Sequence, residues 1–374
     1  LGPILAGFRG RNPIAGMLKK DKPELEAELR AAAGGASCAT VTYRELMRGA
    51  GGLYAPSLDA LIARLAGADD HMALHLAEIA DVLRLAVPLL DFLSRSRPAI
   101  VIGAFEKSYL GALLPAACAA TGTRLINVQH GLVPGCPSLD LVRFDDFVAW
   151  DRDSADSIRA SGYPAGGTLR IIGNPRWQGG RSDRDARGGL LAEWKGADRL
   201  VVAFTQPAKW PFVTAGDTRV FLDALARLVG SVSGLKLLIK QHESERAADY
   251  PPQIRRLITD GRARAVAYRE LPFDTAVRLA DATVSISSTA ILDALAAGRP
   301  SVACNLTGGH QRCSLRLPEF VPVARTEAEL ADLLEAALRG ETLPDERTLD
   351  AWRRPDPRGY APAAAELARG SSGT

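Results

Sequence analysis

The sequence predicts an α/β protein with two doubly wound domains, and three observations support this. Short apolar segments rich in β-branched residues alternate with segments of helical periodicity, which is the pattern of parallel strands joined by helical crossovers. The alternation occurs twice, before and after a stretch at 177–197 that is rich in Gly, Arg and Asp. The length of 374 residues is enough for two separate hydrophobic cores.

The first series of elements predicts an N-terminal domain of residues 1–178. Residues 1–50 carry no clear period and are expected to be irregular, whereas residues 58–93 have a helical period that Pro88 should kink or end early. Strands are then expected at 99–105, 124–129, 146–150 and 169–172, and helices at 108–120 and 154–161. Parallel strands with helices between them follow from this order.

The second series predicts a C-terminal domain of residues 198–345, after a linker at 179–197. Strands are expected at 200–204, 236–240, 263–267, 283–286, 301–304 and 321–323, and helices at 218–228, 252–259, 274–279, 290–297 and 327–339. A tail at 346–374 could cross back to the first domain. In open α/β sheets ligands bind at the carboxyl ends of strands, so we expect a cleft between the domains lined by these ends.

The composition is that of an ordinary globular protein, with 47% hydrophobic and 24% charged residues. The formal net charge is only +3 and the basic residues are dispersed, which argues against a nucleic-acid-binding surface. No apolar run approaches the roughly 18 residues of a membrane span, and we expect no signal peptide. The five cysteines have no CxxC spacing, so reduced thiols in a cytosolic protein are expected.

Three consecutive hydroxyl side chains, Ser287, Ser288 and Thr289, stand where a predicted strand ends and a predicted helix begins. The first amides of a helix lack intrahelical partners and the helix dipole is positive there, so this place suits a phosphate. The simpler interpretation is that Ser288 or Thr289 only caps the helix. Asp293, one turn further on the face of Thr289, could bind a ribose or be an exposed helix residue.

Polar residues follow other predicted strands. Gln129, His130 and Gly131 end a strand, and an imidazole beside a flexible glycine suits a general base or a loop histidine bonded to backbone. Lys240 and His242, two apart on a strand, face the same side and could approach a phosphate or be solvated.

Four further candidates stand at other strand ends. Asn174 and Arg176 lie in a Gly-Asn-Pro turn that leads to the linker, from which either could face the cleft. Thr205 and Gln206 end the first strand of the second domain, where a nucleotide could meet the loop.

One acidic residue of the first domain completes the set of candidates. Glu106 follows a predicted strand and is a second candidate for acid–base chemistry. We find no Asp-x-Asp pair suited to a metal, because Asp151 and Asp153 are better explained as the start of a helix.

In this order, four motifs resemble those of two-domain bacterial glycosyltransferases of the GT-B fold, in particular those that build capsules, teichoic acids and related surface glycans. The motifs are Gln129-His130-Gly131, Gly173-Asn174-Pro175-Arg176, Ile239-Lys240-Gln241-His242 and Ser287-Ser288-Thr289 through Gly298-Arg299-Pro300. The resemblance covers about residues 99–339. Two positions depart from it, since Glu243 stands where the group has Pro and Asp293 where it has Glu.

The resemblance implies two Rossmann-like domains with a nucleotide donor in the second and an acceptor in the first. It implies donor contacts by residues that include Lys240, His242, Ser287, Ser288 and Thr289. It further implies that His130 is the base that deprotonates the acceptor hydroxyl, or a group that positions this hydroxyl. Transfer without a metal or other cofactor is expected, because hydroxyls, a histidine and a helix dipole can stabilise the leaving nucleotide.

The resemblance also favours a cytidine-linked donor of a sugar or a polyol-phosphate unit, with a uridine-linked donor as the alternative. It implies a glycan or lipid-linked acceptor, in a cytoplasmic enzyme that could touch the inner face of the membrane. Two alternatives stay open at this point. The first is a nucleotide-sugar 2-epimerase of the same fold, which would need several carboxylates and basic residues around one sugar. The second is a non-catalytic protein that binds a glycan or a partner enzyme.

Overall fold

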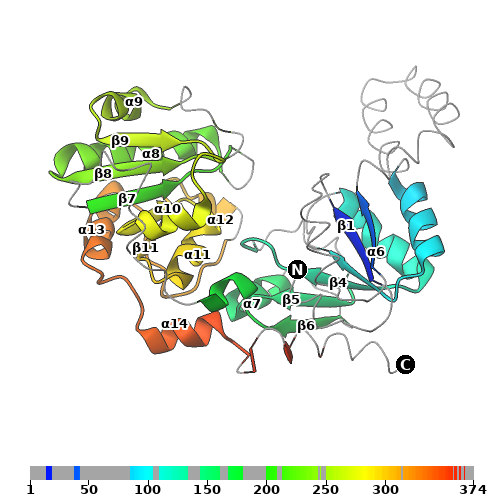
Figure 1. Ribbon diagram of the computed structural model, residues 1–374. Coiled ribbons are helices and arrows are strands. Elements are labelled where there is room, and N and C mark those ends of the chain that lie inside the picture. Colours follow the sequence, from blue (N-terminus) through cyan, green and yellow to red (C-terminus); the bar gives the residue numbers. More distant parts are fainter. Residues whose placement is uncertain are drawn as a thin grey trace, which may run out of the picture. The chain divides into compact units, whose positions relative to one another are not determined.

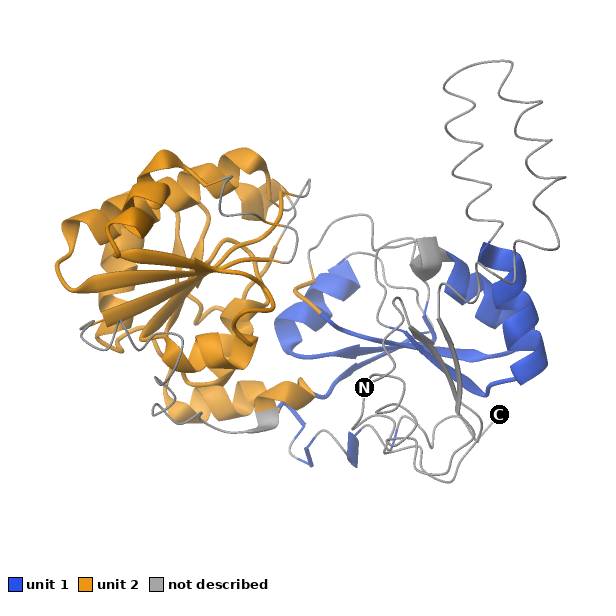
Figure 2. Ribbon diagram, turned by 45° about the horizontal axis from the view of Figure 1, so that its top comes forward, with its two compact units in different colours: residues 1–130, 137–173, 355–374 blue, residues 131–136, 174–354 orange. Residues whose placement is uncertain are grey.

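The structure is a computed structural model of the chain. It describes residues 14–18, 38–42, 85–103, 109–133, 144–160, 167–179, 199–208, 213–242, 245, 250–312, 315–356, 358–359, 362–363 and 366, with backbone only at 14–18, 38–42 and 109–112. The chain divides into two compact units, which Figure 2 colours separately. Unit 1 comprises residues 1–130, 137–173 and 355–374, and unit 2 comprises residues 131–136 and 174–354.

Unit 1 holds a parallel sheet whose six described strands have the order β2-β1-β3-β4-β5-β6 (Figure 1). The strands are β1 (Ile14–Leu18), β2 (Cys38–Thr42), β3 (Ile100–Gly103), β4 (Arg124–Val128), β5 (Asp146–Ala149) and β6 (Thr168–Ile171). The prediction that residues 1–50 are irregular was wrong, because β1 pairs with both β2 and β3. Its partner β3 lies more than 80 residues along the chain, beyond the reach of a local pattern.

The described helices of unit 1 confirm the predicted alternation of strands and helices. Helix α6 (Tyr109–Thr121) joins β3 to β4, and α7 (Arg152–Ala160) joins β5 to β6. A helix at 85–96 continues past Pro88, so this proline does not end it. Asp151 Oδ1 accepts the amide of Ser154 at 2.7 Å, which confirms that Asp151 starts a helix.

Unit 2 holds a second parallel sheet, whose six described strands have the order β12-β11-β10-β7-β8-β9. The strands are β7 (Arg199–Phe204), β8 (Leu235–Lys240), β9 (Ala263–Val266), β10 (Ala282–Ser285), β11 (Ser301–Cys304) and β12 (Val323–Ala324). Read from β9, this is the 3-2-1-4-5-6 order of a dinucleotide-binding domain. The order reverses between β7 and β10, so the switch point lies where Phe204 and Ser285 end their strands.

Helices cover both faces of this sheet (Figures 1 and 2). One core joins the sheet to α8 (Ala215–Ser231), α9 (Pro252–Thr259) and α13 (Glu327–Leu338). The other joins it to α10 (Phe273–Leu279) and α11 (Ala290–Ala296). Along β7, Val201 packs in the first core and Val202 in the second, which is the alternation of a strand buried on both faces.

Three short elements of unit 2 were not predicted. They are the 3₁₀ turn η2 (Pro175–Gly179), α12 (Gly309–Arg312) and α14 (Glu346–Arg353). The predicted linker lies outside the described residues beyond position 179. In the part of the chain that the structure describes, no helix is long and apolar enough to cross a membrane.

Candidate functional site

A side-chain hydrogen bond crosses the switch point of the unit 2 sheet. Gln206 follows β7 and Ser287 follows β10, and the amide and hydroxyl of Ser287 donate to Gln206 Oε1 at 3.0 and 3.1 Å. The loops after the two central strands are thereby joined where ligands bind in sheets of this order. Because the hydroxyl of Ser287 already donates its proton to Gln206, Ser287 helps to hold the two loops in place.

A cavity of about 390 Å³ opens beside this junction. It is lined by residues that follow four neighbouring strand ends, namely Phe204, Thr205, Lys240, Gln241, His242, Tyr268, Arg269, Pro272, Phe273, Ser288 and Ala290. The volume lies in the range of small-molecule sites. Aromatic rings line it together with cationic side chains and a hydroxyl, a combination that suits a ligand with both a flat ring and a negative charge.

Ser288 is the residue of the Ser287-Ser288-Thr289 motif that lines the cavity. Its Oγ accepts the amide of Ala290 at 3.2 Å, so it caps the first turn of α11 and can still donate its proton. Thr289 precedes α11 without capping it through its side chain. The two interpretations of the motif, cap and ligand contact, are therefore compatible in Ser288.

Lys240 is buried, and its ammonium is held by the loop after β9. Nζ donates to the carbonyl oxygens of Ala267 and Tyr268 at 3.1 and 2.6 Å and lies 4.9 Å from the centroid of the Tyr268 ring. Burial lowers the pKa of this lysine, and the charge of Glu270 only partly opposes the shift. Lys240 therefore fixes the loop that carries Tyr268, which corrects the expectation that its ammonium points to a phosphate.

Glu245 connects the ends of β7 and β8. Its Oε2 accepts the hydroxyl of Thr205 at 2.6 Å and the amide of His242 at 2.8 Å. The Thr205 proton is therefore engaged within the protein, although Thr205 lines the cavity. His242 is half-buried and lines the cavity, and its backbone amide is held by Glu245.

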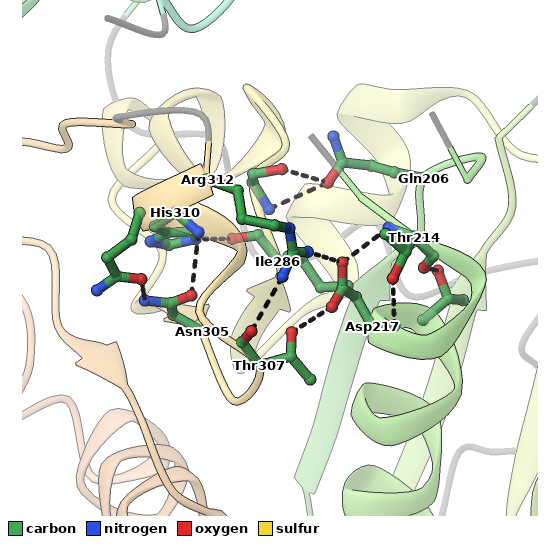
Figure 3. A network of polar contacts seen from close by, with 11 residues as sticks. Gln206, Thr214, Asp217, Ile286, Asn305, Thr307, His310 and Arg312 are labelled. Carbon is green, nitrogen blue, oxygen red and sulfur yellow. Dashed lines mark hydrogen bonds and ion pairs between the residues drawn. The ribbon is translucent and has the colours of Figure 1, made fainter. Parts of the chain in front are cut away.

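The first turn of α8 is closed to an anion, in contrast to the region of Ser288. Asp217 accepts the amide of Thr214 at 2.7 Å and donates its own amide to Thr214 Oγ1 at 3.1 Å, which forms a capping box. The carboxylate also binds Arg312 and the hydroxyl of Thr307 (Figure 3). Negative charge already occupies this helix end, so a phosphate is favoured on the β10 side of the switch point.

His310 belongs to the same polar network. Its Nε2 lies 2.6 Å from the carbonyl oxygen of Ile286, and its amide donates to Asn305 Oδ1 at 3.0 Å. Burial lowers the pKa of the imidazole against the carbonyl contact, and the charge of Arg325 adds to the shift. His310 itself is buried and lies in the short helix α12.

Both carboxylate oxygens of Asp293 contact residues of unit 2, although a ribose contact was expected for this residue. Its Oδ1 accepts the indole N–H of Trp177 at 2.7 Å and its Oδ2 lies 3.4 Å from Arg176 Nη2. Burial raises the pKa of the carboxyl, although Arg176 and Trp177 oppose the shift. Both Asp293 and Arg176 therefore act in an internal pair that holds η2 against α11, and Asn174 Oδ1 supports η2 by accepting the amide of Arg176 at 3.0 Å.

In unit 1, Gln129 is a structural residue. It is buried, its Oε1 accepts the amide of Trp150 at 2.8 Å and its Nε2 donates to Ser154 Oγ at 2.8 Å. This corrects the expectation that Gln129 touches an acceptor. His130 is exposed at the end of the same strand, and Gly131 follows it in unit 2. Glu106 lies outside the described residues.

Sequence reasoning missed Tyr268, Arg269 and Phe273. They stand after the predicted strand at 263–267, and Tyr268 is 54% exposed although it is a large aromatic residue. An aromatic–basic pair directly after a strand was the signal that could have found them. Among the described residues, Cys118 and Cys304 are buried with pKa values raised by burial to about 12, and no cluster of metal-ligating side chains is found.

Comparison with known proteins gives similarity in structure and none in sequence. No family model matches the chain, and no curated protein matches it. Anabaena Alr3699/HepE in complex with UDP and glucose aligns with a TM-score of 0.60 at 14% identity, over 100% of this chain and 95% of that chain. A putative UDP-N-acetylglucosamine 2-epimerase from Listeria monocytogenes aligns with a TM-score of 0.55 at 12% identity, over 95% and 94%.

The lipopolysaccharide outer core galactosyltransferase WaaB, in its apo form, aligns with a TM-score of 0.53 at 12% identity, over 96% of this chain and 99% of that chain. These alignments extend over both units. With the two parallel sheets described above, they show that the chain has the GT-B fold with two Rossmann-like domains. This confirms the fold class predicted from the sequence.

Proposed function

We propose that the protein is a glycosyltransferase that uses a nucleotide-activated donor bound in the unit 2 cavity. The observation that carries the proposal is the composition of this cavity at the switch point. The exposed ring of Tyr268 and the half-buried ring of Phe273 offer flat faces to a base, while Ser288, His242 and Arg269 offer hydrogen-bond donors or positive charge to a phosphate. Base–aromatic stacking contributes about 1–3 kcal/mol per base in nucleic-acid-binding proteins.

The likeness in fold supports a sugar nucleotide as the ligand. HepE is solved with UDP and glucose, and a protein described as MnaA from S. aureus is solved with UDP. The motif resemblance favours cytidine instead. We therefore propose a pyrimidine nucleotide, and a ligand panel decides between the two bases.

The proposed reaction assigns one step to each unit. His130 accepts the proton of the acceptor hydroxyl, whose oxygen attacks the anomeric carbon of the donor. The bond from that carbon to the phosphate oxygen breaks, and the nucleotide leaves with the electron pair. Ser288 and His242 stabilise the charge on the leaving group, so that the proposal requires no metal. The proposed acceptor is a glycan or a lipid-linked glycan of a bacterial surface polysaccharide.

The experiment is a turnover assay with UDP-, CDP- and CMP-linked sugars and glycan acceptors, read by mass spectrometry of the products. His130→Ala should lower kcat by about 10²–10⁴-fold, the usual contribution of a general base, with nucleotide affinity unchanged. Retained turnover would remove His130 from the mechanism. Turnover that EDTA abolishes would contradict the metal-independent part of the proposal.

The alternative of a 2-epimerase predicts a different product in the same assay. It would convert the donor sugar to its epimer in the absence of any acceptor. We favour transfer because epimerisation needs acidic and basic groups around the sugar, and no described residue that lines the cavity is Asp or Glu. Epimerised donor without acceptor would reverse this preference.

A further inference from the structure

The backbone is anchored on both sides of His130. Before it, the side chain of Gln129 is fixed in unit 1 by two hydrogen bonds of 2.8 Å, to the amide of Trp150 and the hydroxyl of Ser154. After it, the chain enters unit 2, to which residues 131–136 belong. The exposed imidazole of His130 therefore belongs to a short segment between the fixed side chain of Gln129 and the first residues of unit 2.

The anchor on the unit 2 side is Thr289. The amide of Leu132 donates to Thr289 Oγ1 at 3.2 Å. A methyl group added to the Cα of Gly131 would lie 3.5 Å from the same oxygen, so the backbone passes directly over this hydroxyl. The Thr289 side chain makes no cap bond to α11, although the residue stands at its start. The Thr289 hydroxyl therefore accepts a hydrogen bond from the segment after His130 and not from an amide of α11.

We propose that Thr289 is a positioning residue, whose hydroxyl holds Gly131 and Leu132 and thereby sets the place of His130. The inference rests on the proposed function for its catalytic meaning, because His130 is the base only in that proposal. It assigns different tasks to neighbouring residues of one motif. Ser288 faces the ligand cavity, whereas Thr289 faces the chain that carries the base.

The contact is tested without any substrate by hydrogen exchange of the peptide that contains Leu132. Thr289→Val keeps the shape of the side chain and removes the acceptor, so the Leu132 amide should exchange about 3–10-fold faster, as expected for one net hydrogen bond. Thr289→Ser should exchange like the wild type. Thr259→Val, an exposed position on α9, is the matched control and should leave this peptide unchanged. Unchanged exchange in Thr289→Val would overturn the proposal.

The role of Thr289 in catalysis is tested by comparing the effect of its substitution on kcat with the effect on the Kd for the nucleotide. Thr289→Val should lower kcat by about tenfold or more, because small misplacements of a catalytic group cost up to about 10² in rate. The Kd for the nucleotide, measured by calorimetry, should stay within about twofold, and Thr289→Ser should restore turnover. A Kd that rises as much as kcat falls would show a phosphate ligand and overturn the positioning role. If the wild type transfers no sugar, the proposed function fails, while the exchange experiment still decides the contact.

Discussion

Asp217→Asn is expected to destabilise unit 2 strongly, although Asp217 lies outside the ligand cavity. The carboxylate is buried, with 5% of the residue exposed, and binds Arg312, Thr307 and the amide of Thr214. An asparagine keeps the shape but turns an N–H₂ group toward these donors and removes the charge opposite Arg312. Hydrogen bonds to charged groups contribute about 1.5–3 kcal/mol each, and Arg312 is partly solvated, so we expect a loss of about 2–4 kcal/mol.

The assay is calorimetric or urea unfolding of the wild type and the variant. About 2–4 kcal/mol corresponds to a decrease in Tm of about 5–15 °C for a domain of 150–250 residues. Asp260→Asn is the matched control, because its side chain is 50% exposed in a 3.8 Å pair with Arg256, and such pairs contribute little. If Asp217→Asn unfolds within about 0.5 kcal/mol of Asp260→Asn, the contacts of Asp217 with Thr307 and Arg312 do not stabilise unit 2.

The pH dependence of the same variant gives an independent check. Burial alone would raise the pKa of the Asp217 carboxyl, but the hydrogen bonds from Thr307 and Thr214 and the charge of Arg312 hold it below the ordinary value. A carboxyl with a depressed folded pKa stabilises the protein above its unfolded pKa of about 3.9, and this contribution is lost as the pH falls further. The wild type should therefore lose its advantage over Asp217→Asn below about pH 4.

Two further predictions concern the polar groups at the switch point. Burial depresses the pKa of His310, so as the pH falls the unfolded chain takes up a proton on this imidazole before the folded protein does. The free energy of unfolding should therefore decrease below about pH 6.5. His310→Gln, which has no imidazole to protonate, should show a smaller decrease. Ser288→Ala should weaken nucleotide binding about tenfold in calorimetry, whereas Ser287→Ala, whose hydroxyl is bound to Gln206, should change it much less; equal effects would contradict the division of roles.

The alternation of elements from residue 99 onward was predictable, because most strands there are buried apolar runs, although β6 is only partly buried. Strand β11 and helix α9 have the predicted bounds. Strands β1 and β2 were not predictable, since the sequences IAGML and CATVT are short and β1 joins the rest of the sheet through β3, far along the chain. A short parallel strand is recognised by its neighbours in the sheet more than by its own residues.

The strand-end motifs gave the place of the candidate site but not the task of each residue. Lys240 is bound by carbonyls 27 and 28 residues further on, and Asp293 by an indole 116 residues before it. From the local motif, both side chains could contact a ligand. In the folded protein, both instead make hydrogen bonds with residues that are distant in the sequence. Burial makes such pairing obligatory, because an unpartnered charge in the interior is costly.

The central claim is that the unit 2 cavity binds a nucleotide with its base on Tyr268. The most direct measurement is isothermal calorimetry of CMP, CDP, UDP, GDP and ADP on the wild type and on Tyr268→Ala. We predict that a pyrimidine nucleotide binds the wild type and that Tyr268→Ala weakens this binding about 10–100-fold, the cost of one lost stacking contact, without lowering Tm. Equal affinity in both proteins, or no binding of any nucleotide, would contradict the account.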